Sequence, residues 1–279
     1  MRPKLYYMNR QELVNLIKER QSYLCVGLDT DLHKIPRHLL SYPDPVFAFN
    51  KAIIDATKDL CVSYKINTAF YECMGIRGWE TLQRTVEYIP SGMFTIADAK
   101  RGDIGNTSTQ YAKTFFETYK FDAVTVAPYM GRDSVQPFLS FHEKWTIMLG
   151  LTSNEGNSDF QMQQVGNEYL YEKVLKAGIN WGTPDNLMFV IGATNDPAQL
   201  AHIRQLVPDH FFLVPGVGAQ GGSLQEISAN AMNKDCGLLV NASRSIIYAG
   251  NGEDFAQDAR VAAKELQREM AEYLEAAIV

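Results

Sequence analysis

The amino-acid sequence predicts an α/β protein folded as a single (β/α)8 TIM barrel that occupies residues 1–279. Eight short apolar runs recur along the chain, and segments long enough to form helices separate them. Eight parallel strands alternating with helices is the number that closes such a barrel, whose usual size is about 250 residues. No low-complexity segment or linker divides the chain. An open, doubly wound sheet has the same alternation and is the alternative architecture.

The predicted strands are these apolar runs, several of them nearly continuous in Val, Ile, Leu and Phe. Such runs are typical of parallel strands that are buried on both faces. They occupy residues 23–28, 61–66, 93–97, 123–127, 146–151, 187–191, 211–214 and 237–240. Helices are predicted in the periodic segments between them, among them residues 47–58, 77–88, 107–119 and 224–233.

An extra helix is predicted before the first strand. Asn9 and Glu12 have the spacing of a capping box, in which each residue satisfies a free backbone N–H of the other. The helix that follows places Leu13, Leu16 and Ile17 on one face. We expect this apolar face to close the bottom of the barrel.

Composition excludes several classes of protein. A net charge of −6 argues against nucleic-acid binding, which needs clustered Lys and Arg. No run approaches the roughly 18 apolar residues of a membrane span, and the first nine residues do not resemble a secretory signal. The four cysteines are scattered, which predicts buried, reduced thiols in a cytoplasmic protein. The five histidines lack metal-ligand spacing, so no metal site is expected.

Charged side chains gather at the end of the third predicted strand. Side chains alternate faces along a strand, so Ile96, Asp98 and Lys100 are expected to point the same way. Lys65, at the end of the second strand, would reach the same mouth of the barrel, where barrel enzymes place their chemistry. Because a buried charge without a partner is costly, these groups must pair with each other or serve a ligand.

Asp103 follows a short turn after Lys100 and comes just before a predicted helix. Taken alone, it would most often cap that helix, and an Asp-x-Lys pair at a strand end is usually a solvated ion pair. Asp and Lys side chains brought together in one cleft, however, are typical of a functional site. The combination therefore predicts an active site at this end of the barrel.

A glycine-rich segment, residues 215–222, follows the seventh predicted strand and contains GxGxxG. Taken alone, this motif suggests a dinucleotide-binding loop, but that loop follows a first strand, and Asn241 stands roughly where its ribose-binding acid should be. The loops after strands seven and eight of a barrel are a usual phosphate site. Arg244, after the eighth strand, can hold a phosphate in bidentate fashion, and backbone N–H groups of the glycines would complete the site.

These motifs resemble those of the orotidine 5′-phosphate decarboxylases. The signature of that family is similar to the run that joins Asp98, Lys100, Asp103, Ile104 and Thr107. Residues 64–72 resemble the second-strand segment of the family's longer bacterial class. Further matches at residues 27–29, at residues 215–222 and at Arg244 extend the resemblance over nearly the whole chain.

The resemblance implies the loss of CO2 from C6 of orotidine 5′-phosphate to give UMP, the last step of de novo UMP synthesis, with no cofactor. Lys100 would stabilise the C6 carbanion and then protonate it, and Asp98 would lie near the substrate carboxylate. Lys65 and Asp103 would hold this array in place. The resemblance also implies a homodimer, in which Asp103, Ile104 and Thr107 enter the partner's site.

The substrate-binding residues that the resemblance implies lie on several loops at the same end of the barrel. They are Asp29, Asn67, Ile104, Thr107, Ser153, Pro215, Gln220, Gly221 and Arg244. Asp29 and Thr107 would contact the ribose, and Gln220 the phosphate. The loop after the fifth strand departs from the commoner family pattern, so either Ser153 or Asn154 is expected over the pyrimidine.

Two other functions remain open on the sequence. A metal-dependent sugar-phosphate isomerase or aldolase shares the barrel and the Asp-x-Lys-x-x-Asp motif, but would need His or further acidic ligands at the strand ends. A nucleotide-binding module without catalysis would leave the paired lysines and aspartates without a purpose. The most informative single experiment is to add the protein to orotidine 5′-phosphate, because loss of the substrate's absorbance is expected of the decarboxylase alone.

Overall fold

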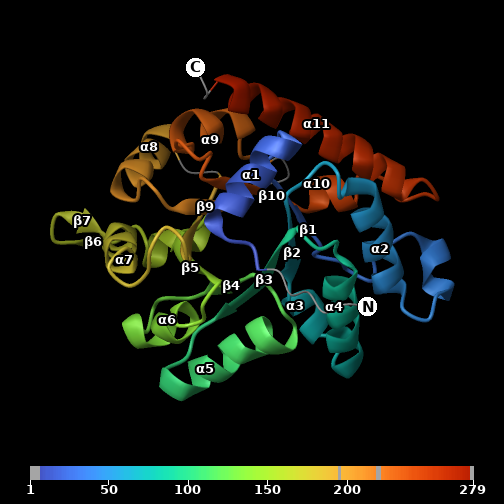
Figure 1. Ribbon diagram of the computed structural model, residues 1–279, viewed down its shortest axis with the longest axis horizontal. Coiled ribbons are helices and arrows are strands. Elements are labelled where there is room, and N and C mark those ends of the chain that lie inside the picture. Colours follow the sequence, from blue (N-terminus) through green and yellow to red (C-terminus); the bar gives the residue numbers. More distant parts are fainter. Residues whose placement is uncertain (1–6, 194–195, 218–220, 277–279) are drawn as a thin grey trace.

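The computed structural model describes residues 7–193, 196–217 and 221–276 (Figure 1). Eight parallel strands close into a barrel in the order β1-β10-β9-β8-β5-β4-β3-β2. Their bounds are Leu24–Gly27 (β1), Ser63–Asn67 (β2), Phe94–Arg101 (β3), Ala123–Val126 (β4), Trp145–Leu151 (β5), Leu187–Ile191 (β8), Phe211–Pro215 (β9) and Leu238–Ala242 (β10). Each predicted run overlaps with one of these strands, and closure of the ring excludes the open sheet.

Helices form a layer around the ring of strands (Figure 1). They are α2 (Pro45–Thr57), α3 (Ala69–Glu72), α4 (Ile76–Tyr88), α5 (Gly105–Lys113), α6 (Arg132–Leu139), α7 (Leu170–Gly178), α8 (Pro197–Leu206), α9 (Leu224–Ala231), α10 (Arg244–Ile247) and α11 (Phe255–Ala276). Shorter elements are the 3-10 turns η1 (Arg37–Ser41) and η3 (Glu155–Asp159), the π-helical turn η2 (Thr114–Thr118), and a hairpin of β6 (Gln164–Val165) and β7 (Glu168–Tyr169).

Two predicted elements need correction. The helix predicted at residues 107–119 begins two residues earlier and is divided between α5 and the π-helical turn η2. The strand predicted at residues 93–97 continues to Arg101 as β3, because its polar end still pairs with β4 after an irregular stretch. The apolar run stopped where the charges of the site begin, but the placement of Asp98 and Lys100 on the same strand already implied most of this extension.

Large aromatic side chains fill the amino end of the barrel. Phe94, Trp145 and Phe211 are the first residues of β3, β5 and β9, and all three are buried. Ring centroids lie 6.1 Å apart for Phe94 and Trp145 and 6.4 Å apart for Trp145 and Phe211, in edge-to-face geometry. Burial of such rings is a large apolar contribution to stability.

The helix before the first strand, α1 (Arg10–Arg20), closes this amino end, as the sequence predicted. Its capping box of Asn9 and Glu12 is formed, and Leu13 and Ile17 are buried. The carbonyl of Met8 accepts a hydrogen bond of 2.9 Å from the indole of Trp145, at the start of β5. Figure 1 shows α1 crossing the centre of the barrel.

The cysteines of the chain are free thiols. Cys25, Cys61 and Cys236 are buried, as expected from their places in or beside the strands, and burial raises the pKa of each thiol to about 12. Cys73 differs, because it follows the short helix α3 and is exposed.

Candidate active site

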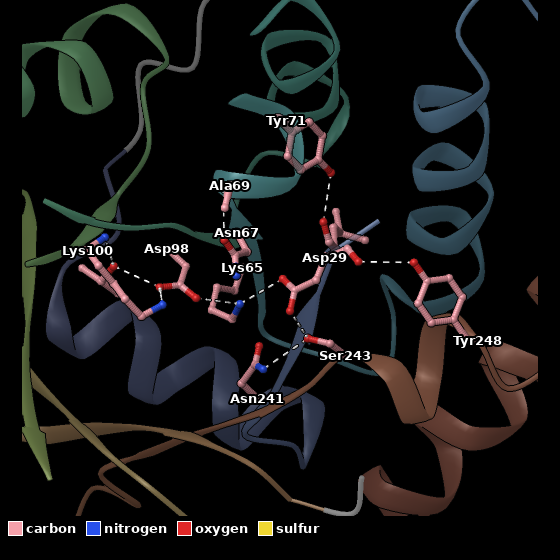
Figure 2. A network of polar contacts seen from close by, with 12 residues as sticks. Asp29, Lys65, Asn67, Ala69, Tyr71, Asp98, Lys100, Asn241, Ser243 and Tyr248 are labelled. Carbon is pink, nitrogen blue, oxygen red and sulfur yellow. Dashed lines mark hydrogen bonds and ion pairs between the residues drawn. The ribbon is translucent and has the colours of Figure 1, made fainter. Parts of the chain in front are cut away.

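Four charges of alternating sign lie in a row at the carboxyl ends of β1, β2 and β3 (Figure 2). The ammonium nitrogen of Lys65 is 3.1 Å from Asp29 Oδ1 and 3.1 Å from Asp98 Oδ2. The other oxygen of Asp98 is 2.6 Å from the ammonium nitrogen of Lys100. Adjacent parallel strands place these side chains together, as the sequence predicted for Lys65, Asp98 and Lys100.

Burial differs sharply along this row. The side chain of Lys65 is 4% exposed and that of Asp98 is 10% exposed, whereas that of Lys100 is 51% exposed. Burial disfavours both buried charges, but the carboxylates of Asp29 and Asp98 outweigh it and raise the pKa of Lys65. Burial likewise opposes ionisation of Asp98, yet Lys65 and Lys100 hold its pKa well below the usual range. Both groups are therefore charged at neutral pH.

Asp29 is fixed from the opposite side by the end of β10. The hydroxyl of Ser243 donates a hydrogen bond of 2.9 Å to Asp29 Oδ2. This approach is possible because residue 27 is glycine, since a Cβ there would lie 1.8 Å from the Ser243 hydroxyl oxygen. The hydroxyl of Tyr248 also donates to the backbone carbonyl of Asp29, at 3.3 Å (Figure 2). Asp29, two residues after β1, is thus held by side chains from β2, from the end of β10 and from the end of α10.

The end of β3 departs from regular strand geometry. Its pairing with β4 shifts between Ala97 and Arg101, and Lys100 has a φ of 46°. This left-handed conformation costs free energy for a residue with a side chain, and it persists only where the surrounding structure imposes it. Here the Lys100 N–H donates a 2.8 Å hydrogen bond to the hydroxyl of Thr125, which itself donates to Asp98 Oδ1 at 3.1 Å. The two side chains meet because of this irregular stretch, whereas the sequence predicted regular alternation.

A cavity joins the charged row to the glycine-rich loop after β9. Its walls include Asp29, Lys65, Asp98 and Lys100 on one side and Pro215, Gly216 and Arg244 on the other. Gly216 has a φ of 100°, and its carbonyl accepts a 3.1 Å hydrogen bond from Gly222 N–H, which closes the loop. Arg244 begins α10 and is exposed, and among the described residues no carboxylate lies within ion-pairing distance of it. It is available to an anion.

Among the described residues, six predicted site residues do not line this cavity: Asn67, Asp103, Ile104, Thr107, Ser153 and Gly221. Asn67 ends β2 beside Asp98, and its side-chain oxygen accepts from Ala69 N–H at 3.2 Å. Asp103 does not join the row of charges, and its carboxylate accepts a 2.8 Å hydrogen bond from Ile104 N–H. Ile104 and Thr107 are exposed at the start of α5. Within one chain, the structure does not bring Asp103, Ile104 and Thr107 to Lys100.

The loop after β5 leaves the choice between Ser153 and Asn154 open. The side-chain oxygen of Asn154 accepts from the hydroxyl of Thr152 at 2.6 Å. Ser153 packs against Gly192, where a Cβ would lie 2.6 Å from that of Ser153. Of the two remaining positions, Gly221 is exposed with a φ of 88°, and Gln220 lies outside the described residues.

Thr125, Asn241 and Ser243 are site residues to which the sequence analysis gave no role. Thr125 is a polar residue inside the apolar run 123–127, and Asn241 and Ser243 stand in the run that leads to Arg244. Asn241 and Ser243 line the cavity, and among the described residues the side-chain oxygen of Asn241 is buried without a hydrogen-bond partner. A polar residue within an otherwise apolar strand was the signal that could have indicated them.

Among the described residues, no group of three or more His, Cys, Asp or Glu side chains is arranged to hold a metal ion. No helix in the same part of the chain has the length and apolar character needed to cross a membrane.

Residues 22–259 match the model of the family described as orotidine 5′-phosphate decarboxylase / HUMPS. The chain belongs to this family. A Bacteroides fragilis protein named orotidine 5′-phosphate decarboxylase is 58% identical over 273 residues, which cover 96% of this chain and 99% of the relative. A Christiangramia forsetii protein of the same name is 57% identical over 271 residues, with the same coverage of each chain. The resemblance noted in the sequence is thereby confirmed.

Solved structures agree with this family membership. The structure of Leishmania donovani OMP decarboxylase is similar, with a TM-score of 0.82 and 37% sequence identity. The match covers 95% of this chain and 98% of that one. The closed barrel of this chain is therefore the fold of a solved family member over nearly its full length.

Proposed function

We propose that the protein decarboxylates orotidine 5′-phosphate to UMP, the last step of de novo UMP synthesis, without a cofactor. The observation that carries the proposal is the row Asp29, Lys65, Asp98 and Lys100, whose exposed end faces the cavity that also contains Arg244. The names of the relatives and their coverage support the same substrate. A cytoplasmic location is part of this proposal.

The reaction breaks the bond between C6 and the carboxylate carbon. CO2 departs, and the electron pair stays on C6 in the plane of the ring, where it cannot delocalise into the π system. A fixed positive charge is then the available form of stabilisation. An ammonium about 4 Å from the carbanion contributes ~4 kcal/mol at an effective dielectric constant of 20. Transfer of a proton from the same ammonium to C6 completes UMP, and water reprotonates the neutral amine.

Lys100 suits this role better than Lys65. The ammonium of Lys65 is buried between two carboxylates, so two of its three donors are occupied and its pKa is raised. The ammonium of Lys100 has one carboxylate partner among the described residues, Asp98, and is half exposed towards the cavity. Lys65 therefore holds the carboxylates in place, and Lys100 has donors left for a substrate.

Asp98 remains ionised beside the position proposed for the substrate carboxylate. Its low pKa follows from Lys65 and Lys100, which together offset the cost of burial. Repulsion between the two carboxylates would fall as CO2 leaves, although the fixed arrangement of charges is the larger expected contribution. The paired lysines allow this negative charge to persist in a buried place.

The phosphate is proposed to bind at the other end of the cavity, on Arg244 and the loop of residues 215–222. The exposed guanidinium of Arg244 can donate two parallel hydrogen bonds to a phosphate. Asp29, with Asn67 nearby at the end of β2, would contact the ribose. Binding energy from this distant phosphate can then support closure around the pyrimidine, where Ser153 or Asn154 would lie.

We further propose a homodimer in which Asp103, Ile104 and Thr107 complete the partner's site. The carboxylate of Asp103 does not reach the charged row of its own chain. Ile104 is 54% exposed, and on the neighbouring loop after β4 the side chains of Tyr129 and Met130 are 83% and 48% exposed. Apolar side chains exposed beside one mouth of the barrel favour a protein interface there.

The test is an assay of the purified protein with orotidine 5′-phosphate, monitored by loss of the substrate's absorbance. We expect UMP as the product, and full activity after exhaustive dialysis against EDTA. Activity that is lost on dialysis and restored by a divalent ion would favour the isomerase or aldolase. Tight binding of the nucleotide with no turnover would favour the binding module.

A further inference from the structure

We propose that Thr125 is a positioning residue, whose single hydroxyl sets the relative placement of Asp98 and Lys100. The proposal rests on the proposed function, because it concerns the proton donor of that reaction. Thr125 lies on β4 and is fully buried, and it contacts both residues without lining the cavity itself.

The first argument comes from the strand pairing. Ala97 pairs with Val124 and Arg101 pairs with Val126, so residues 98–100 of β3 lie opposite Thr125 alone. Such a bulge interrupts the ladder and redirects side chains, and bulges are common beside active sites. The amide of Lys100 consequently bonds to the side chain of Thr125 instead of a backbone carbonyl.

The second argument comes from the capacity of one hydroxyl. It can donate one hydrogen bond and accept others. Thr125 accepts from Lys100 N–H at 2.8 Å and donates to Asp98 Oδ1 at 3.1 Å. The same Asp98 oxygen receives the ammonium of Lys100 at 2.6 Å. The backbone N–H of Lys100 is therefore hydrogen-bonded to Thr125 and its ammonium to Asp98, and Thr125 and Asp98 are hydrogen-bonded to each other.

The third argument is the conformation of Lys100. Its φ of 46° is unfavourable for a residue with a side chain, and its side chain is half exposed, so packing alone does not hold it. Without the Thr125 hydroxyl, the Lys100 amide would lose its partner and the bulge would be free to relax. The ammonium would then move relative to C6, while the phosphate end, formed by the loop after β9 and by Arg244 on α10, would be unaffected.

The experiment compares Thr125→Val, which has nearly the same shape without the hydroxyl, with Thr125→Ser, which keeps the hydroxyl. Thr146→Val is the matched control, because Thr146 is a buried threonine on the next strand, β5, whose hydroxyl has no partner among the described residues. We expect Thr125→Val to lower kcat by about 10- to 100-fold, as misplacement of a reacting group by an ångström does, with KM little changed. Thr125→Ser and Thr146→Val should stay within about 3-fold of wild type.

A kcat of Thr125→Val within about 3-fold of wild type would overturn the proposal. Equal losses of kcat in the Ser and Val variants would also overturn it, because they would show that Thr125 acts through packing alone. If the Val variant does not fold, the proposal is tested instead by measuring amide hydrogen exchange in the wild type and in Thr125→Ser. Slow exchange at Lys100 N–H in both supports the hydrogen bond, and unprotected exchange in the wild type contradicts it. A wild-type protein without decarboxylase activity would overturn the proposed function itself, whereas an active wild type with an active Val variant removes only the role of Thr125.

Discussion

At the scale of single residues, the site depends on two lysines with the same charge in different surroundings. Lys65 is enclosed by Asp29 and Asp98, and Lys100 extends from a strained backbone towards the cavity. Substituting Lys65 would leave two buried carboxylates facing each other, so its loss would damage structure and activity together. Substituting Lys100 would remove a half-exposed group and should affect mainly the chemistry.

We therefore expect Lys100→Ala to reduce kcat by more than about 10³-fold, while the protein stays folded and still binds UMP. The ammonium acts on a charge that exists only in the transition state, and the loss of such an interaction lowers kcat. Steady-state kinetics and calorimetric titration with UMP measure the two effects. Lys51→Ala is the control, because Lys51 is a comparably exposed lysine paired with Asp55 on α2. Near-normal turnover in Lys100→Ala would exclude Lys100 as the proton donor.

Arg244 offers a second prediction at this scale. Loss of a charged hydrogen-bonding group should raise KM for orotidine 5′-phosphate by about 10- to 100-fold in Arg244→Ala. Turnover of unphosphorylated orotidine should change little, because that substrate never makes the contact. The exposed Arg268, on α11, provides the control substitution Arg268→Ala. Equal damage with both substrates would mean that Arg244 acts on folding or on the pyrimidine.

At the scale of elements, the sequence indicated the strands well and their ends poorly. The run 187–191 coincides with β8, because a strand covered on both faces is marked along its whole length by apolar residues. The irregular conformation at the end of β3 could not be predicted, since the bulge and the left-handed Lys100 arise from contacts with Thr125 on another strand. The sequence placed Asp98 and Lys100 together on the assumption that side chains alternate along a regular strand. The two residues do form an ion pair, but the backbone between them is irregular.

The turn between α8 and β9 contains a histidine, His210, that should make the stability of the fold depend on pH. His210 is buried there, and among the described residues both of its ring nitrogens lack hydrogen-bond partners. Burial, aided by Arg10 and Arg204, lowers the pKa of His210 to about 4. An unfolded chain regains the ordinary value near 6.5, so between these values the unfolded state binds more protons. This contribution to stability is complete above pH 6.5 and is lost as the pH falls towards 4.

Replacing His210 by Phe should remove that part of the pH dependence. Within the window, the free energy of unfolding of the wild type should fall by up to about 1.4 kcal/mol per pH unit more steeply than that of His210→Phe. Urea denaturation at several values between pH 4 and 7 measures the difference. His142→Phe, at an exposed position, is the control and should keep the wild-type slope. Parallel curves for wild type and His210→Phe would show that His210 titrates normally in the folded protein.

At the scale of the whole molecule, the sequence predicted the barrel, the closing helix and the end of the barrel that carries the site. These follow from patterns within one chain: eight apolar runs, a capping box, and charges at strand ends. Asn241 and Ser243 were given no role, since their importance depends on Gly27 and Asp29, which lie more than 200 residues away in the chain. Whether Asp103 acts in its own chain or in another depends on assembly, which a pattern within one chain does not contain.

The proposed dimer makes a specific prediction about mixed subunits. If Asp103 serves the partner's site, a dimer of one Lys100→Ala chain and one Asp103→Ala chain has one site with both defects and one with neither. Mixing the two inactive variants, unfolding them and refolding them together should restore activity. About a quarter of the wild-type level is expected from random pairing, because half the dimers would be mixed and each would hold one intact site.

The matched control is a mixture of Lys100→Ala with Asp98→Ala. Asp98 and Lys100 are in contact within one chain, so each mixed dimer would carry one defect in each site and activity should stay absent. Mass spectrometry under native conditions would establish that mixed dimers have formed in both samples. Recovery in the Asp103 mixture alone is then specific to a residue that crosses the interface. If mixed dimers are present and neither sample recovers, Asp103 serves its own chain, and its carboxylate must reach the charged row by a movement of the segment between β3 and α5.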